Sequence, residues 1–285
     1  LHALTLPKDP EELKANTLEL AQLLIAVGLD PQDCILFIQS HVPEHSQLAW
    51  LMECTVSFGE LNRMTAFKDK SGRNEFISGG LFTYPALQAA DILLYDTDLV
   101  PVGDDQRQHI EITRDIAERF NSRFGETFVV PKHVIPPSGA RIMDLQNPNR
   151  KMSKSEISPG GTIGVLEPSD AISKKIKRAV TDSHTEVRFD IDEKPGVSNL
   201  LSILGAATSA DPKLLADQYN RYGDLKNDTA EAVIELLNPI QKRFYDLQAD
   251  PGETQRLLQL GASKAKEISS ATLSRAKANC GLLQP

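Results

Sequence analysis

Helical and strand-like patterns of apolar residues alternate along the first half of the chain. Over residues 10–28 apolar positions recur on one helical face, acidic residues occupy the first turn and a glycine closes the segment, which predicts a helix. The run 34–38 is short and continuously apolar, as is typical of a buried parallel strand. Further helices are predicted over 45–58, over 78–95 and from Asp104 onward, with another strand at 99–102. This alternation predicts a parallel sheet covered by helices on both faces.

The pattern changes in the second half of the chain. Short apolar runs at 128–130 and 140–143 predict a further strand and its return. From residue 169 onward helical periodicity dominates, with expected helices over 196–207, 212–219, 229–247 and 253–277, one of them kinked or divided at Pro239. We therefore predict an α/β fold with a doubly wound parallel sheet in residues 1–168, followed by an all-helical domain in residues 169–285.

Composition places the chain among ordinary globular proteins. It has 285 residues, of which 40% are hydrophobic and 25% charged. No apolar run is long enough to span a membrane, no signal-peptide pattern opens the chain, and three cysteines without metal-site spacing favour a reducing cytoplasm. The net charge of -8 argues against a surface that is basic throughout, although it allows a local basic patch.

The histidines after residue 2 do not form a sequence cluster. They are scattered at His41, His45, His109, His133 and His184. We therefore predict neither a metal site nor a histidine-activated nucleophile.

A cationic run stands near the middle of the chain. Lys151, Met152, Ser153, Lys154 and Ser155 are followed by Ser-Pro-Gly-Gly at 158–161. Two flexible ammonium groups with neighbouring hydroxyl and amide donors suit a loop that closes over phosphates. An exposed basic loop without a ligand is the alternative for a generic pair of lysines at this spacing.

A second candidate site follows the strand predicted at 99–102. Gly103 permits close approach of the backbone to a ligand, and Asp104 and Asp105 stand at the mouth of a helix, where carboxylates can accept hydrogen bonds from sugar hydroxyls. Taken alone, the two acids are better explained as helix caps. With the cationic run downstream, ligand binding becomes the preferred interpretation.

Several motifs together resemble the bacterial tryptophanyl-tRNA synthetases, a family of class I aminoacyl-tRNA synthetases. The cationic run matches the second signature of that class. The resemblance covers essentially the whole chain in order, and its further segments are 67–71, 84–95, 99–106, 141–145, 174–183 and 195–201. It implies a Rossmann-like sheet whose first strand, with a HIGH-like signature, is expected about forty residues upstream of His2.

The resemblance assigns an amino-acid pocket. It implies that Asp91 accepts the indole N–H of tryptophan, that Val100 and Val102 line the indole slot, and that His2 belongs to the pocket. A carboxylate suits this task because the indole nitrogen is a donor only. Gln88 stands where many bacterial relatives have methionine, so it adds polar atoms beside the indole. The alternatives without a ligand are that Asp91 is a solvated carboxylate and that His2 is a frayed terminal residue.

The resemblance also implies roles toward ATP, which is a substrate. Lys151 and Lys154 would stabilise charge on the departing pyrophosphate, and Lys70 would be a further phosphate-facing lysine, with an exposed solvated lysine as a nearly equal alternative. The remaining ATP-binding residues implied are Gly103, Asp104, Asp105, Gln106, Ile142, Met152, Ser153 and Ser155.

The activity implied is ATP-dependent activation of L-tryptophan and its transfer to tRNA(Trp). Mg²⁺ carried with ATP, a homodimer and an anticodon-reading helical domain are expected with it, and the basic face 174–178 is a candidate for tRNA phosphates. A tyrosyl-tRNA synthetase is the nearest alternative. A truncated, non-catalytic paralogue that binds tryptophan, nucleotide or RNA is another, and a nucleotidyltransferase of the same superfamily would leave the Asp91 helix unexplained.

Overall fold

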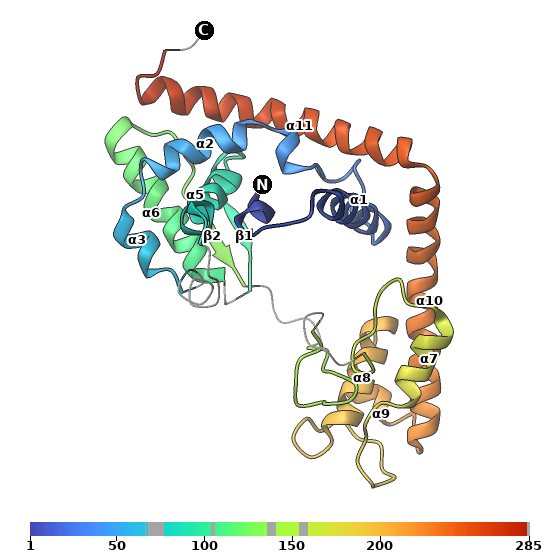
Figure 1. Ribbon diagram of the computed structural model, residues 1–285. Helices are drawn as coiled ribbons and strands as arrows, with labels where there is room; N and C mark the ends of the chain where they lie inside the picture. Colours follow the sequence, from blue (N-terminus) through green and yellow to red (C-terminus); the bar gives the residue numbers. More distant parts are fainter. Residues whose placement is uncertain (66, 68–76, 104–105, 136–140, 154–158, 284–285) are drawn as a thin grey trace. The chain divides into compact units, whose positions relative to one another are not determined.

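The computed structural model describes residues 1–65, 67, 77–103, 106–135, 141–153 and 159–283 (Figure 1). The chain forms two compact units. Unit 1 consists of Leu1–Pro137 together with Asp250–Pro285, and unit 2 is Ser138–Ala249. These limits are set by packing and differ from the functional boundary predicted near residue 168, which stays a prediction.

Unit 1 is mostly helical around a small sheet. Its elements are η1 (His2–Thr5), α1 (Pro10–Ala26), η2 (Gln39–His41), α2 (Glu44–Glu53), α3 (Phe58–Arg63), α5 (Gly79–Leu93), β1 (Leu99–Pro101), α6 (Arg107–Phe124), β2 (Lys132–Val134) and α11 (Pro251–Asn279). Helices were expected over most of these segments, and α1, α5, α6 and α11 confirm that expectation. Asp9 caps α1 by accepting a hydrogen bond from the Glu12 amide, and Ser78 caps α5 in the same way through the Leu81 amide.

The described sheet has two parallel strands. β1 pairs with β2, with Val100 opposite His133. The strand predicted at 99–102 is confirmed, whereas the one predicted at 128–130 is displaced, because the ladder forms over Lys132–Val134 instead. Parallel pairing across the intervening helix α6 is the crossover that the alternating pattern predicted.

The prediction of a strand at 34–38 is wrong, because this segment pairs with no strand among the described residues. It packs against helix α11 instead, so closely that a Cβ added to Gly261 would lie 1.9 Å from the Leu36 carbonyl oxygen. Ile35 is left 40% exposed. The run is apolar because it lies between helices, not because it is central in a sheet.

The helix predicted over 45–58 corresponds to α2, which ends earlier, at Glu53, and a second helix, α3, begins at Phe58. Ser57 separates them with a capping box, in which its hydroxyl accepts from the Glu60 amide at 3.3 Å and Glu60 accepts from the Ser57 amide at 2.8 Å. Glu60 also pairs with Arg119 of α6. This Arg119 contact holds the Glu60 pKa at about 2, although burial opposes the shift.

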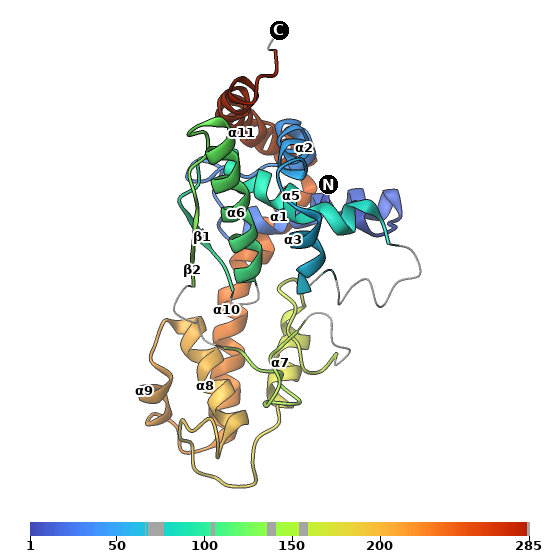
Figure 2. The same ribbon diagram turned by 90° about the vertical axis from the view of Figure 1, so that its left-hand side faces the viewer.

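The core of unit 1 lies where α5 packs against α2 and α6 (Figure 2). Leu48 and Met52 of α2, together with Ala86, Ala89 and Ala90 of α5, are fully buried there. The small alanines let the two helices approach closely. Helix α11 adds Leu273 and Ala276 to the same core, so residues from both ends of the chain complete it.

The described part of unit 2 packs four helices around a second core. They are α7 (Ser169–Lys177), α8 (Pro195–Thr208), α9 (Pro212–Ala216) and α10 (Tyr222–Ala249). The helical character predicted after residue 169 is confirmed for these elements, and Pro239 lies inside α10 without dividing it. The core joins Ile172 and Ile176 of α7 to Leu200 and Leu204 of α8.

Candidate functional site

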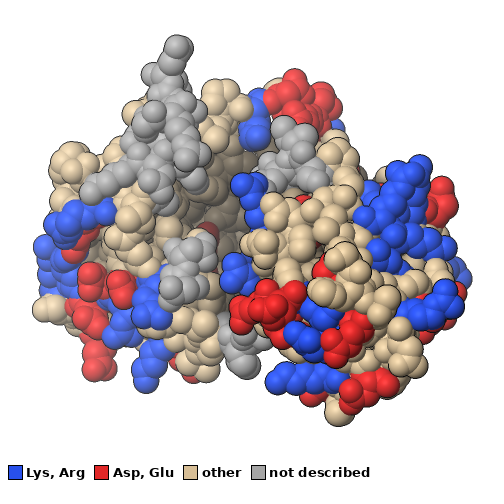
Figure 3. Space-filling model, turned by 90° about the horizontal axis from the view of Figure 1, so that it is seen from below, with Lys and Arg blue, Asp and Glu red and all other residues tan. Residues whose placement is uncertain are grey.

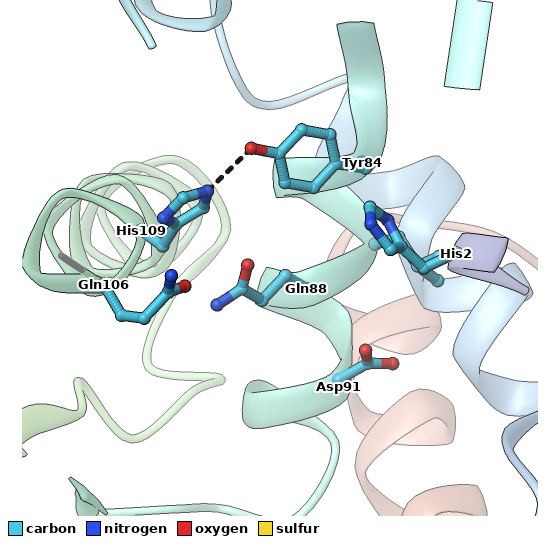
Figure 4. A pocket seen from close by; sticks show the side chains of 7 residues that line it. His2, Tyr84, Gln88, Asp91, Gln106 and His109 are labelled. Atoms are coloured by element: carbon cyan, nitrogen blue, oxygen red, sulfur yellow. Dashed lines mark hydrogen bonds between the residues drawn. The ribbon is translucent and has the colours of Figure 1, made fainter. Parts of the chain in front are cut away.

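A cavity of about 450 Å³ lies within unit 1 (Figure 4). Helix α5 supplies Tyr84, Leu87, Gln88 and Asp91, which recur at intervals of three and four residues and therefore share one helical face. The other described lining residues are Gln106, the N-cap residue of α6, His109 of α6 and His2 of η1. The size and the mixture of aromatic and polar walls suit a small-molecule ligand.

Aromatic rings form one end of this cavity. The His2 and Tyr84 rings meet edge to face, with their centroids 5.0 Å apart. The Tyr84 hydroxyl lies 2.8 Å from Nε2 of His109, as the dashed line in Figure 4 marks. Burial raises the pKa of Tyr84, so its hydroxyl stays protonated and can donate.

A carboxylate stands at another part of the cavity wall. The Oδ1 atom of Asp91 accepts a hydrogen bond of 2.7 Å from Nε2 of Gln39 and lies 2.6 Å from Nδ1 of His45. The His45 side chain is buried, at 3% exposed, whereas the Asp91 side chain is 35% exposed. The Asp91 carboxylate on α5 is thus a partly exposed acceptor, and the buried His45 side chain of α2 supports it.

The cavity brings together four residues that the resemblance assigned, namely His2, Gln88, Asp91 and Gln106. In Figure 4 Gln88 points toward Gln106 at the N-cap of α6, and the Asp91 carboxylate points away from that pair. Val100 lies in β1 and Val102 follows it, and neither is among the described lining residues. Their predicted contacts with indole, like the other residue roles, stay predictions.

The sequence analysis assigned no role in the pocket to three of the described lining residues, namely Tyr84, Leu87 and His109. Their positions were available from spacing, because Tyr84 and Leu87 lie seven and four residues before Asp91, and His109 lies three residues after Gln106. Lys70, Asp104 and Asp105, to which the predictions also assigned roles, lie outside the described residues. Gly103 is exposed at the end of the segment that follows β1.

The cationic run begins in unit 2, at the end of a short hairpin. Met143 and Lys151 form an antiparallel bridge, and the Met152 amide donates to the Ile142 carbonyl at 3.1 Å. Ile142 and Met152 pack against the unit 2 core, while Lys151 is exposed. The carbonyl of Ser153 accepts from the Thr162 hydroxyl. Lys154 and Ser155 lie outside the described residues.

Two side chains hold this hairpin through its backbone. The buried amide of Asn199 brackets Met143, accepting from its N–H and donating to its carbonyl, both at 2.8 Å. Asp144 accepts from the amides of Gln146 and Asn147. Gly161 lies so close to Asp144 that an added Cβ would be 2.1 Å from its carboxylate oxygens. The base of the cationic run is therefore fixed while the Lys151 side chain remains accessible.

A second cavity, of about 380 Å³, lies on unit 2 beside helix α7. Its described lining residues are Gln146, Pro159, Gly160, Ala171, Lys174, Lys175 and Arg178. Lys175 is engaged by Glu167 and by the Thr162 carbonyl. Figure 3 shows Lys and Arg side chains gathered on its right, the side on which α7 lies in Figure 1.

Among the residues that the structure describes, no three His, Cys, Asp or Glu side chains gather as a metal site would require. None of the described helices is both long enough and apolar enough to cross a membrane.

Comparison with known proteins identifies the class to which this fold and these motifs belong. Residues 1–238 match the family model described as tRNA synthetases class I (W and Y). A tryptophan–tRNA ligase of Caldanaerobacter subterraneus subsp. tengcongensis is 52% identical over 285 residues, covering 99% of this chain and 86% of that protein. One from Mycobacterium leprae is 51% identical over 287 residues, covering 99% and 84%. The chain belongs to the class I tRNA synthetases for tryptophan and tyrosine, and the predicted resemblance to the bacterial tryptophan enzymes is confirmed.

Solved structures agree with this assignment. Tryptophanyl-tRNA synthetase from Mycoplasma pneumoniae is 39% identical with a TM-score of 0.84, covering 99% of this chain and 86% of that chain. The enzyme from Campylobacter jejuni, complexed with ADP and tryptophan, is 33% identical with the same TM-score, covering 99% and 87%. A tyrosyl-tRNA synthetase from Archaeoglobus fulgidus is only 22% identical, with a TM-score of 0.62, and shares the fold alone. The class I synthetase fold with a small parallel sheet is thereby established.

Proposed function

We propose that this chain activates L-tryptophan with ATP and transfers the aminoacyl group to tRNA(Trp). The observation that carries the proposal is the unit 1 cavity, whose described aromatic and polar walls, with Leu87, include the partly exposed carboxylate of Asp91. Indole is a large apolar ring whose nitrogen is a donor only, so a carboxyl acceptor in the cavity wall selects for it. Relatives about half identical over the whole chain are tryptophan–tRNA ligases, which supports the same choice.

The reaction consists of two displacements. The α-carboxylate of tryptophan attacks the α-phosphorus of ATP in line, forming tryptophanyl-adenylate and releasing pyrophosphate. A ribose hydroxyl at the 3′ end of the tRNA then attacks the acyl carbon and releases AMP. Neither step needs a covalent bond to the protein, so the chain's own residues mainly position reactants and stabilise charge.

The cavity residues have different proposed roles, which follow from the chemistry of their side chains. Asp91 accepts the indole N–H, His2 and Leu87 cover apolar surface, and Gln88 lies beside the ring. The Tyr84 hydroxyl and the Gln106 amide are polar groups that suit the charged amino-acid end of the substrate. Val100 and Val102 complete the indole slot in this proposal.

Toward ATP, Lys151 stabilises the negative charge that develops on pyrophosphate as it leaves. Its exposed ammonium on a held backbone suits that role. We assign the same role to Lys154 and Lys70, and the ribose and adenine contacts to Gly103, Asp104, Asp105, Gln106 and Ile142, with Met152, Ser153 and Ser155 completing the loop. Mg²⁺ carried with ATP would supply further positive charge toward the phosphates.

Tryptophan-dependent ATP–pyrophosphate exchange tests this function. We expect exchange with tryptophan and not with tyrosine, measured on this chain and on a version extended upstream. The Asp91→Asn variant should lose about tenfold to a hundredfold in kcat/KM for tryptophan, because its amide leaves a weaker acceptor for the indole N–H. Exchange with tyrosine would overturn the substrate assignment. Tryptophan binding without exchange in either version would favour a non-catalytic paralogue.

Residues 169–285 are proposed as the tRNA-binding region, with the α7 face as a phosphate contact. Lys174 and Arg178 line the unit 2 cavity, and their side chains make no hydrogen bond or ion pair with the described part of the chain. Replacing both by alanine should raise the KM for tRNA and flatten its salt dependence, because each lost phosphate contact reduces counterion release. Pyrophosphate exchange, which needs no tRNA, should be unchanged. Lys213→Ala, on α9, is the control.

We also propose a homodimer in the cytoplasm, where translation takes place. Trp50 of α2 is 65% exposed and Phe58 of α3 is 72% exposed, which is unusual for large apolar side chains. Burial of these two side chains by a second copy of the chain would explain their exposure in a single copy. Trp50 is the only tryptophan in the sequence, so its fluorescence should shift to longer wavelength as dilution separates the copies. A concentration-independent spectrum together with a monomer in sedimentation would overturn the proposal.

A further inference from the structure

We propose that His45 is a positioning residue for substrate recognition. Together with Gln39 it holds the Oδ1 atom of Asp91, so that Oδ2 is left to accept the ring N–H of the bound amino acid. This inference deepens the proposed function and rests on the role that it gives to Asp91. His45 was predicted to be an isolated histidine, and the structure instead places it in direct contact with the cavity wall.

The geometry assigns both supporting contacts to one carboxylate oxygen. Nδ1 of His45 lies 2.6 Å from Oδ1 of Asp91, and Nε2 of Gln39 donates to the same atom at 2.7 Å. Within the described part of the chain, Oδ2 has no hydrogen-bond partner. A carboxylate with both oxygens unheld can rotate about its terminal torsion. Two donors on one oxygen fix the direction in which the other oxygen points.

The partner on the far side of the imidazole determines which nitrogen carries the proton. Nε2 of His45 lies 2.8 Å from the Tyr95 hydroxyl. Burial, with a smaller contribution from the Asp91 charge, raises the pKa of Tyr95 to about 12, so this hydroxyl stays protonated. A hydroxyl that donates to Nε2 leaves the imidazole hydrogen on Nδ1, where it points at Asp91. In this arrangement Tyr95 donates to His45, and His45 donates to the Asp91 carboxylate.

Packing fixes the imidazole ring within this chain. The ring of Phe37 lies 5.6 Å from that of His45 and 6.2 Å from that of Tyr95, measured between centroids. Since the His45 side chain is 3% exposed, water does not compete for its nitrogens. A ring held in this way can orient a carboxylate more sharply than a solvated donor would.

The alternative is that His45 only ties α2 to α5. Two substitutions separate the roles, because the Asn side chain places its amide nitrogen near the position of Nδ1 and the Gln side chain places its own near Nε2. His45→Asn therefore keeps a donor for Asp91 and loses the Tyr95 contact. His45→Gln keeps a group near Tyr95 and withdraws the donor from Asp91. A purely structural role predicts similar losses in both variants.

The readout is discrimination between tryptophan and 3-benzothienylalanine, in which sulfur replaces the indole N–H. The ratio of their kcat/KM values in pyrophosphate exchange isolates the hydrogen bond, since both ligands fill similar space. We expect His45→Gln to reduce this ratio about tenfold, through a higher KM for tryptophan at unchanged KM for ATP. His45→Asn should restore most of the ratio. His41→Gln, the same change at an exposed position, is the matched control.

The outcomes separate this inference from the proposed function. If the unmodified chain, or its upstream-extended version, activates both ligands equally, the proposed role of Asp91 is overturned. The positioning role of His45 depends on it and is then overturned too. If that protein discriminates and His45→Gln still does so fully, only the positioning role is overturned. Should thermal unfolding show that His45→Gln is not folded, Gln39→Met decides the question, since it removes the second donor to the same oxygen. An unchanged ratio in Gln39→Met would then overturn the inference.

Discussion

The two candidate sites differ in how the fold holds them. In unit 1 the cavity is built from side chains on helices, and its carboxylate is fixed by other side chains, Gln39 and His45. In unit 2 the cationic run is held through its main chain, with Asn199 bracketing Met143 and the Lys151 side chain left exposed. The first arrangement suits recognition of one rigid ligand, and the second suits a charge that must reach a leaving group.

The two units also differ in their balance of basic and acidic residues. Unit 2 contains 15 of the 31 Lys and Arg residues and 16 of the 39 Asp and Glu residues, so unit 1 holds the other 16 basic and 23 acidic residues. The acidic balance of the chain is thus almost entirely a property of unit 1. A local basic face can exist on unit 2 without opposing a strongly acidic background.

The largest expected effect separates chemistry from recognition. Lys151→Ala should lower kcat for pyrophosphate exchange by about a hundredfold to a thousandfold while leaving the KM for tryptophan unchanged, because the lost charge acts on the departing group. Lys151→Arg should recover part of the rate, since it keeps the charge with a different shape. A rise in KM for tryptophan with kcat preserved would contradict the division between the two sites.

A glycine substitution tests whether the backbone of the cationic run must be held. Gly161→Ala would place a Cβ 2.1 Å from the Asp144 carboxylate and force it away from two backbone amides. We expect a loss of about 2 kcal/mol in stability and a lower kcat, with the affinity for tryptophan preserved. At Gly160 the nearest atom to an added Cβ is 3.5 Å away, so Gly160→Ala is the control. Equal behaviour of the two variants in urea unfolding would refute this account.

The Glu60–Arg119 pair gives unit 1 a distinct acid response. The Glu60 pKa is about 2 in the folded protein and near 4.5 when unfolded, so the pair stabilises the fold above pH 4.5. That contribution is lost as the pH falls toward 2, because the unfolded chain then binds the extra proton. Glu60→Gln should therefore cost about 2 kcal/mol at pH 7, after allowance for solvent screening, and progressively less below pH 4.5.

Denaturant unfolding of both proteins between pH 7 and pH 3 measures this difference. Glu253→Gln, which breaks an exposed pair with Arg256, should have a smaller effect. A constant difference between wild type and Glu60→Gln across that range would rule out the proposed titration.

The smallest expected effect concerns Gln88. Gln88→Met removes polar atoms from the cavity and should lower the KM for tryptophan about twofold to threefold, because an apolar side chain loses no hydration when it meets the indole face. The KM for ATP should not change. A higher KM for tryptophan would mean that the Gln88 amide makes a favourable contact with the substrate.

Local pattern predicted much of this architecture. Periodicity located α1, α5, α6, α11 and the helices of unit 2, because each buries one apolar face. Motifs pointed to Asp91 and Gln106, which line the unit 1 cavity, whereas the role assigned to Lys151 stays a prediction. The break between α2 and α3 was missed, although the spacing of Ser57 and Glu60 is that of a capping box.

Long-range contacts account for the remaining differences. Nothing local shows that 34–38 lies against α11, more than two hundred residues away, or that His45 meets Asp91 from another helix. Apolar runs of this length are compatible with a strand or with a buried connection, and only the tertiary partner decides between them. The same reason made His45 look isolated.

The division of unit 1 between the two ends of the chain affects how the protein is made. Helix α11 follows unit 2 in the chain and is therefore made after it, yet Leu273 and Ala276 complete the core that α2 and α5 begin. Unit 2 is fully synthesised before that happens, so it can fold while the earlier segment still exposes apolar surface. The core of unit 1 is therefore complete only when α11 docks, and a chain released before α11 is made would have all of unit 2 but an incomplete unit 1 core.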